Sequence, residues 1–278
     1  MYVMGAGTMG SGIAQVAAAA DINVFLVDTS SAAIAKSREA LARSLDGGIE
    51  RGKLTPQQAA EIRSRIRWQT DYRGIRQAEW IVEAVFEAMS AKRAVLERID
   101  ANAAAGAVIS TNTSTLSIDT LAEISGRPER FIGLHFFNPP PAMKLVEIIP
   151  GSETLEEVMD TALQLCERMG KEGIVAPDIP GFFVNRVFGA ILSSAIDIWA
   201  QGADPADIDR AIELGLAHRM GPLATADLVG LDVVLALLES LGEQTGHERF
   251  DIPEKFRAMV NEGRLGRKSG EGFYSYND

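Results

Sequence analysis

Two residues in the middle of the chain, His135 and Glu147, have the types and the spacing of an acid/base pair. An apolar run that begins at Phe131 contains the histidine, a proline-rich bend follows, and a second apolar run carries the glutamate and ends at Pro150. Two such runs around a bend predict neighbouring strands, which would hold an imidazole and a carboxylate on rigid elements. Imidazole exchanges protons near neutral pH, and a carboxylate on its second ring nitrogen fixes the tautomer. The alternative is a core histidine, packed between apolar neighbours, with one satisfied hydrogen bond.

A second motif with chemical meaning, Gly5-Ala-Gly-Thr-Met-Gly10, lies at the N-terminus. A short strand-like run precedes it, an alanine-rich helical segment follows, and the next strand-like run ends in Asp28. In this pattern Gly5 permits the tight turn, Gly7 lets the backbone approach a pyrophosphate, and Gly10 lets the helix pack on the strand. Asp28 stands where an acid binds the ribose hydroxyls of adenosine, and no arginine follows it to accept a 2′-phosphate. The pattern predicts a dinucleotide site that favours NAD over NADP; the alternative is a glycine-rich turn in an unrelated α/β domain.

Further polar residues follow other predicted strands. Glu87 and Lys92 lie beyond a strand expected over residues 80–85, and the hydroxyl-rich run 111–115 follows one expected over residues 107–110. Residues beyond the carboxyl end of a parallel strand face the ligand crevice, which favours a functional role for Glu87 and Lys92 over a surface ion pair. Taken alone, the run 111–115 is interpreted as a cap of the helical segment that follows it.

The order of predicted strands and helices divides the chain into two domains. Up to residue 178 strands alternate with helices, which is typical of an α/β, Rossmann-type, mostly parallel sheet. Beyond a proline and glycine break only helical periodicity remains. The helical patterns cover residues 182–200, 205–216, 224–243 and 254–262. We expect an NAD-binding domain over residues 1–178 and a smaller all-α substrate and dimerisation domain over residues 179–278.

The composition narrows the classes of partner. The net charge of −11 opposes attraction to nucleic acid or to an anionic membrane, so local basic groups and helix N-termini must hold an anionic cofactor. No apolar run has the length of a membrane span and no signal peptide is visible, so we expect a cytoplasmic protein. Cys166 is the only cysteine, which excludes an internal disulfide and a cysteine metal site; no metal cluster is expected. The apolar content of the helical region predicts a homodimer through it, unless these faces pack on the first domain.

Several motifs, in their order along the chain, resemble those of the L-3-hydroxyacyl-CoA dehydrogenase family, especially its short bacterial 3-hydroxybutyryl-CoA dehydrogenases. The resemblance spans nearly the whole chain. Beyond the glycine turn, the motifs are Ile81-Val-Glu-Ala-Val-Phe-Glu87, Asn112-Thr-Ser114, His135-Phe-Phe-Asn-Pro139, Met143-Lys-Leu-Val-Glu147, Pro180-Gly-Phe-Phe-Val-Asn-Arg186, Met220-Gly-Pro-Leu223 and Gly266-Arg-Lys-Ser-Gly-Glu-Gly-Phe-Tyr274.

The resemblance implies roles for individual residues. His135 would be the catalytic acid/base, Glu147 would orient it, and Ser114 and Asn185 would contact the substrate. The cofactor positions would be Gly5, Gly7, Thr8, Met9, Gly10, Asp28, Glu87, Lys92, Asn112, Ser114, Asn138 and Lys268. Ser44 and Arg51 would contact CoA, although composition alone would assign Arg51 to a solvated surface.

The implied reaction is the NAD-dependent oxidation of an (S)-3-hydroxyacyl-CoA to the 3-oxoacyl-CoA, or its reverse, as in fatty acid metabolism. The chain departs from the family in two places. Residues 46–48, Asp-Gly-Gly, interrupt a segment that is often more basic and helical, and residues 224–226 lack a glutamate that many members carry. These departures concern helix contacts and acyl specificity rather than the catalytic pair.

Four alternatives to this interpretation of the sequence remain. The 6-phosphogluconate and 3-hydroxyisobutyrate dehydrogenases share the glycine motif and a helical domain, but they use a lysine as acid/base. A gulonate dehydrogenase or lens-crystallin relative is nearer, yet Phe136, Phe137, Met143 and Lys144 resemble the acyl-CoA branch. A third alternative is that the substrate is another 3-hydroxy acid, free or carrier-linked, and the fourth is a non-catalytic NAD-binding relative.

Overall fold

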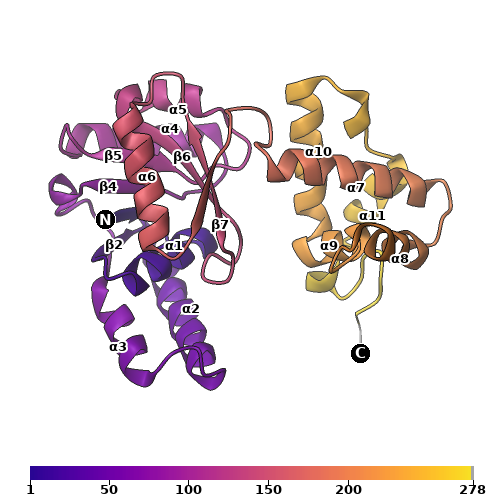
Figure 1. Cartoon of the computed structure of the whole chain (residues 1–278), viewed down its shortest axis with the longest axis horizontal. Helices are drawn as coiled ribbons and strands as arrows, with labels where there is room; N and C mark the ends of the chain where they lie inside the picture. Colours follow the sequence, from indigo (N-terminus) through magenta and orange to yellow (C-terminus); the bar gives the residue numbers. More distant parts are fainter. Residues whose placement is uncertain (277–278) are drawn as a thin grey trace. The chain divides into compact units, whose positions relative to one another are not determined.

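The computed structural model describes residues 1–276 and divides into two compact units (Figure 1). We call Met1–Ile179 the sheet unit and the remainder, which begins at Pro180, the helical unit. Each unit has its own hydrophobic core. The cluster of the sheet unit includes Ile13, Leu26 and Ile132, and that of the helical unit includes Leu192 and Leu238.

The sheet unit is built on one eight-stranded sheet of order β3-β2-β1-β4-β5-β6-β7-β8. Its strands are β1 (Tyr2–Met4), β2 (Val24–Val27), β3 (Ile66–Gln69), β4 (Trp80–Glu83), β5 (Val108–Thr111), β6 (Phe131–Phe136), β7 (Leu145–Pro150) and β8 (Glu172–Val175). The only antiparallel pair in this sheet joins β6 and β7, so the prediction of a mostly parallel sheet is confirmed. The chain proceeds from β1 outward to β3 and then returns to β4 on the other side of β1. Ligands bind at such a reversal, outside the carboxyl ends of the strands.

Helices cover both faces of this sheet (Figure 1). They are α1 (Thr8–Ala19), α2 (Ser31–Glu50), α3 (Pro56–Arg65), α4 (Met89–Asn102), α5 (Ile118–Ile124) and α6 (Glu156–Arg168). Residues of α1 and α6 share one buried cluster with the strands, and α4 and α5 cover the opposite face. Every residue of β4, β5 and β6 is buried, as expected for parallel strands between two helical layers.

The helix α2 runs without a break through the two glycines at 47 and 48, so the interruption expected at residues 46–48 does not occur. A β-carbon on Gly48 would lie 2.8 Å from Leu54 Cδ1, in the connection to α3. The missing side chain thus lets that connection pack closely against α2. Helix α3 begins with a reciprocal capping box between Thr55 and Gln58, which fixes where the α2–α3 hairpin turns.

The helical unit contains five α-helices within the part that the structure describes. They are α7 (Val184–Ala200), α8 (Pro205–Leu216), α9 (Pro222–Val229), α10 (Leu231–Thr245) and α11 (Glu254–Asn261). The single helix expected over residues 224–243 is wrong, because the chain breaks at Gly230 between α9 and α10. Gly230 has a φ of 107°, a conformation open to glycine but not to a regular helix.

Candidate active site

The glycine turn between β1 and α1 has the geometry of a phosphate cradle. Gly5 has a φ of 104°, and a β-carbon on Gly10 would lie 1.9 Å from the Gly5 carbonyl oxygen, so both positions require glycine. A β-carbon on Gly7, the N-cap of α1, would meet nothing within 4 Å. No side chain caps this helix end, so its first N–H groups remain available to an anion. The turn therefore fits the pyrophosphate of a dinucleotide.

Asp28 directly follows β2 and bonds to the glycine turn, at the position where the ribose is expected. Its Oδ2 accepts a 2.9 Å hydrogen bond from the Ala6 amide, and its Oδ1 accepts one of the same length from Ser30. The carboxylate thus holds the turn in place beside the carboxyl ends of β1 and β2. Both the charge and the position suit recognition of ribose hydroxyls.

Removing the Asp28 charge should weaken cofactor binding. Asp28→Asn keeps the size of the side chain but loses a charged acceptor, so the Kd for NADH should rise about 10- to 100-fold in a fluorescence titration. Asp21→Asn, beyond the other end of α1, is the matched control and should leave the Kd unchanged. An unaltered Kd in Asp28→Asn would remove this residue from the cofactor site.

A cleft of about 1070 Å³ brings several predicted positions together within the sheet unit. It is lined by the glycine turn, by α2 and by the bend after β6; its predicted site residues are Gly7, Thr8, Ser44, Arg51 and Asn138. Met9 is not among its lining residues and packs instead against the hydrophobic core. Lys171, which the sequence did not single out, donates to the carbonyls of Pro140 and Met143 at 2.6 and 2.7 Å. It thereby fixes one wall of the cleft.

His135 and Glu147 face each other across the antiparallel pair β6 and β7. They are register partners, and His135 Nδ1 lies 2.7 Å from Glu147 Oε2. Both residues are buried, with exposed fractions of 4% and 1%. Because the carboxylate occupies Nδ1, the other ring nitrogen, Nε2, is the one that can exchange a proton with a reactant. This arrangement can move one proton to or from a bound reactant.

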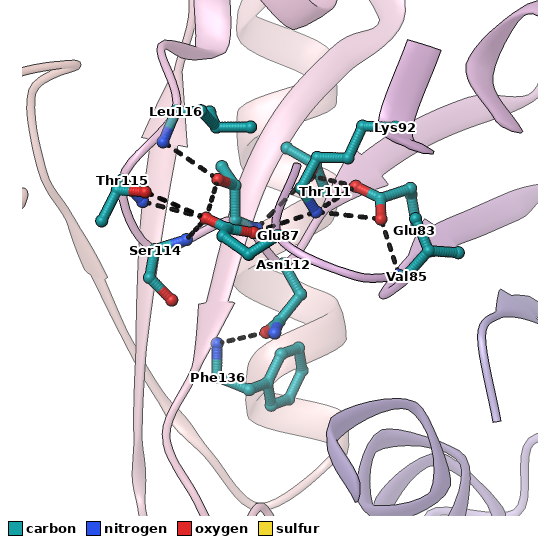
Figure 2. A network of polar contacts seen from close by, with 11 residues as sticks. Glu83, Val85, Glu87, Lys92, Thr111, Asn112, Ser114, Thr115, Leu116 and Phe136 are labelled. Atoms are coloured by element: carbon teal, nitrogen blue, oxygen red, sulfur yellow. Dashed lines mark hydrogen bonds and ion pairs between the residues drawn. The ribbon is translucent and has the colours of Figure 1, made fainter. Parts of the chain in front are cut away.

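A second polar network lies at the ends of β4 and β5 (Figure 2). The buried Lys92 Nζ lies 2.8 Å from Glu83 Oε2 and 3.2 Å from Glu87 Oε2. The other oxygen of Glu87 accepts hydrogen bonds from Thr113 Oγ1 at 2.5 Å and from the Ser114 amide at 2.7 Å. Glu87 therefore holds the loop that carries Ser114, while Lys92 lies behind Glu87 in the interior.

The interpretation of residues 111–115 as a helix cap is wrong. Helix α5 is capped by Ser117, whose Oγ accepts from the Thr120 amide, whereas residues 113–115 bind Glu87. The Asn112 side chain also has a partner within the protein: its Oδ1 accepts a 2.9 Å hydrogen bond from the Phe136 amide. That bond ties the Ser114 loop to the residue that follows His135.

Glu87 should make the stability of the protein depend on pH. Burial raises the pKa of its carboxyl, but Lys92 and hydrogen bonds from Thr113 and Ser114 outweigh burial, so the pKa lies below its ordinary value of 4.5. A carboxyl whose pKa falls on folding adds stability above its unfolded pKa, and that contribution is lost as the pH falls through the folded value.

The wild type should therefore be more stable than Glu87→Gln at neutral pH, and the difference should shrink as the pH falls below 4.5. Urea unfolding of both proteins over a pH series measures this difference. A gap in unfolding free energy that does not change with pH would contradict the assignment of the shift to Glu87.

Two predicted residues belong to the helical unit. Asn185 is the second residue of α7 and is half-buried. Lys268 lies in the short turn Arg267–Ser269, and its ammonium pairs with Asp232 near the start of α10. Within this unit the Lys268 ammonium is thus paired with a carboxylate, and a contact between Lys268 and the cofactor stays a prediction.

Comparison with known proteins now decides the family. The family description "3-hydroxyacyl-CoA dehydrogenase, NAD binding domain" matches residues 1–179. The chain belongs to the 3-hydroxyacyl-CoA dehydrogenase family. The C-terminal domain of the same family matches residues 181–276, so both units are accounted for. This member of the family is an NAD-dependent oxidoreductase, and the predicted resemblance, enzyme class and cofactor are confirmed.

Three relatives are similar over nearly their whole length. The 3-hydroxybutyryl-CoA dehydrogenase of Clostridioides difficile is 39% identical, covering 100% of this chain and 99% of the relative. A probable 3-hydroxybutyryl-CoA dehydrogenase of Bacillus subtilis is also 39% identical, with coverages of 100% and 97%. The crystal structure of (S)-3-hydroxybutyryl-CoA dehydrogenase from Ralstonia eutropha matches with a TM-score of 0.95 and 39% identity, covering 100% of this chain and 98% of that one.

Residues 1–276 lack two kinds of feature. No helix there combines the length and apolar character needed to cross a membrane. Within the same residues, no group of three or more histidine, cysteine, aspartate or glutamate side chains is placed to hold a metal ion.

Proposed function

We propose that this dehydrogenase interconverts (S)-3-hydroxyacyl-CoA and 3-oxoacyl-CoA, with short acyl chains such as 3-hydroxybutyryl, and that His135 and Glu147 are its acid/base pair. The observation that carries the proposal is the buried 2.7 Å contact between His135 Nδ1 and Glu147 Oε2. A core histidine needs only one satisfied hydrogen bond. A buried carboxylate on Nδ1 can in addition stabilise an imidazolium that forms during the reaction.

In the oxidation direction, His135 Nε2 accepts the proton of the substrate C3 hydroxyl. NAD, when bound, would supply the acceptor for the hydride that leaves C3. Glu147 keeps the second ring proton on Nδ1 and stabilises the imidazolium as it forms. In the reduction direction the same imidazolium returns its proton to the C3 oxygen. Ser114 donates a hydrogen bond that holds a substrate oxygen, which would keep C3 in position for hydride transfer. A substrate contact from Asn185 stays a prediction.

The basic residues of the cleft beside α2 support a substrate that is linked to CoA. The protein carries a net charge of −11, so polyanionic CoA requires a local concentration of basic groups. The cleft supplies Ser44 and Arg51 together with Lys36, Arg43 and Lys53. Ser44 and Arg51 are therefore the CoA contacts that we propose.

Steady-state assays with NADH separate this function from the alternatives. Acetoacetyl-CoA should be reduced with NADH, and both NADPH and free acetoacetate should support much lower kcat/KM. Measuring kcat/KM for 3-oxoacyl-CoA substrates of different chain length would define the acyl-chain specificity. Absence of turnover with acetoacetyl-CoA, or equal kcat/KM for free acetoacetate, would overturn the proposal.

We also propose that the protein is a homodimer through the helical unit. The apolar residues Val187, Leu214 and Leu216 are 62%, 68% and 63% exposed, and contact between apolar groups and water is unfavourable. Val187 and Leu216 line an apolar groove of about 480 Å³ between α7 and α8. Such a patch suits a self-complementary interface.

A charge placed in this groove should dissociate the dimer. Light scattering during size-exclusion chromatography should give a dimer for the wild type and a monomer for Leu216→Glu, because the interface would bury an unpaired carboxylate. Glu248→Gln, on the surface of the same unit, serves as a control that should stay dimeric. A monomeric wild type would contradict the assignment.

A further inference from the structure

Glu83 is a buried, hydrogen-bonded carboxylate close to Glu87 and the Ser114 loop, and none of the roles proposed above involves it. It is the last residue of β4 and is fully buried. Its two oxygens accept hydrogen bonds from Lys92 Nζ at 3.0 and 2.8 Å, from Thr111 Oγ1 at 2.6 Å and from the Val85 amide at 2.7 Å (Figure 2). An acid at the end of an otherwise apolar strand is the sequence signal that marks it.

Stability alone does not explain this buried ion pair. Removing a carboxylate and an ammonium from water carries a desolvation penalty that their attraction often fails to exceed. Neutral side chains of similar volume would serve a core equally well. The pair Glu83 and Lys92 is therefore better explained by what it holds in place.

Lys92 connects the buried carboxylate to the site. Its ammonium lies between Glu83 and Glu87, at 2.8 Å from one carboxylate and 3.2 Å from the other. The ends of β4 and β5 fix Glu83, and Glu83 in turn fixes the Lys92 ammonium. The positive charge that attracts Glu87 therefore has one defined position. Glu87, whose side chain is 35% exposed, is held there and not in solvent.

Glu87 in turn orders the loop that presents Ser114. One oxygen, Oε1, accepts from the Thr113 hydroxyl and from the amides of Ser114 and Thr115, at 2.5, 2.7 and 3.2 Å. These bonds fix the backbone on both sides of the Ser114 side chain. The loop follows β5, on the far side of β1 from β2 and Asp28, where the nicotinamide half of a dinucleotide lies when it crosses the reversal in strand order.

We propose that Glu83 is a positioning residue for catalysis: through Lys92 it places Glu87, and through Glu87 it holds the Ser114 loop at the reacting centre. The catalytic part of this inference rests on the proposed function of Ser114. The structural part, a dependence of loop order on Glu83, stands independently of the substrate.

The first variant is Glu83→Gln, which keeps the shape but removes the charge that holds Lys92. The amides of Ser114 and Thr115 should lose protection from hydrogen exchange, and kcat/KM for acetoacetyl-CoA should fall about 10- to 100-fold, as expected for a misplacement of about 1 Å. Ser110→Ala is the matched control. Ser110 is equally buried on β5, but its hydroxyl accepts a 2.9 Å hydrogen bond from Trp80 Nε1 and donates to the Ile81 carbonyl at 3.3 Å, rather than bonding to Glu83.

The control should lower the melting temperature while leaving the exchange of the Ser114 and Thr115 amides and kcat/KM unchanged. Should Glu83→Gln fail to fold, the double variant Glu83→Gln/Lys92→Met replaces the ion pair with neutral side chains of similar size. Its melting temperature should return to that of the wild type, while amide protection and kcat/KM stay low because nothing holds Glu87.

Recovery of amide protection and kcat/KM together with the melting temperature would overturn the proposal, since Glu83 would then merely neutralise Lys92. Unchanged protection in Glu83→Gln would overturn it as well. Failure of the wild type to reduce acetoacetyl-CoA would instead refute the proposed function, and the exchange measurements would still decide the role of Glu83.

Discussion

Replacing His135 with glutamine is expected to lower kcat for acetoacetyl-CoA reduction by about 100- to 10,000-fold, the usual contribution of a positioned general acid/base. Glutamine retains a donor for Glu147 Oε2, which lies 2.7 Å from His135 Nδ1, so the buried carboxylate is not left unpaired. The variant cannot, however, deliver a proton to the C3 oxygen. Steady-state oxidation of NADH measures the loss.

Cofactor binding provides the control for this variant. The proposed contacts of His135 are with the substrate and with Glu147, so the Kd for NADH should match that of the wild type. A glutamine variant with undiminished kcat would show that His135 is a core residue. A parallel loss of NADH binding would show that the substitution disturbs the fold.

Glu147→Gln has the second largest expected effect. Without the carboxylate, the imidazolium at His135 loses its counter-charge, and the amide can bind Nδ1 in the wrong tautomer. The loss in kcat should reach about 100-fold or more, because an isosteric change at the corresponding acid of a serine protease costs about 10,000-fold.

Comparing kcat with KM in Glu147→Gln shows whether Glu147 acts in proton transfer or in substrate binding. Glu147 is 1% exposed and lies behind His135, so substrate should bind nearly as well as before and KM should change little. A raised KM with unchanged kcat would mean that Glu147 contributes to binding rather than to proton transfer.

The sequence predicts those parts of the site that depend on local pattern. The glycine turn and Asp28 follow from the order of strand, turn, helix and strand, and the fold places them as expected. His135 and Glu147 lie on two strands joined by one short bend, so the pattern brings the strands together. Their direct pairing additionally depends on the register of β6 and β7.

Features that depend on contacts between distant elements were not predictable in this way. Lys92 lies on α4, Glu83 on β4 and Thr113 in the loop after β5, and only the folded sheet brings them together. The local pattern predicts a helix cap at the hydroxyl-rich loop, because it does not reveal that Glu87 is near. The break at Gly230 was missed for a similar reason, since apolar periodicity continues on both sides of it.

The central claim is that His135 and Glu147 act as one acid/base unit in a 3-hydroxyacyl-CoA dehydrogenase. The most direct test is kcat for acetoacetyl-CoA reduction in the double variant His135→Gln/Glu147→Gln, compared with both single variants and the wild type. If Glu147 acts through His135, the double variant should be no slower than His135→Gln alone. A double variant whose loss equals the product of the two single losses would show that the residues act independently and would contradict the claim.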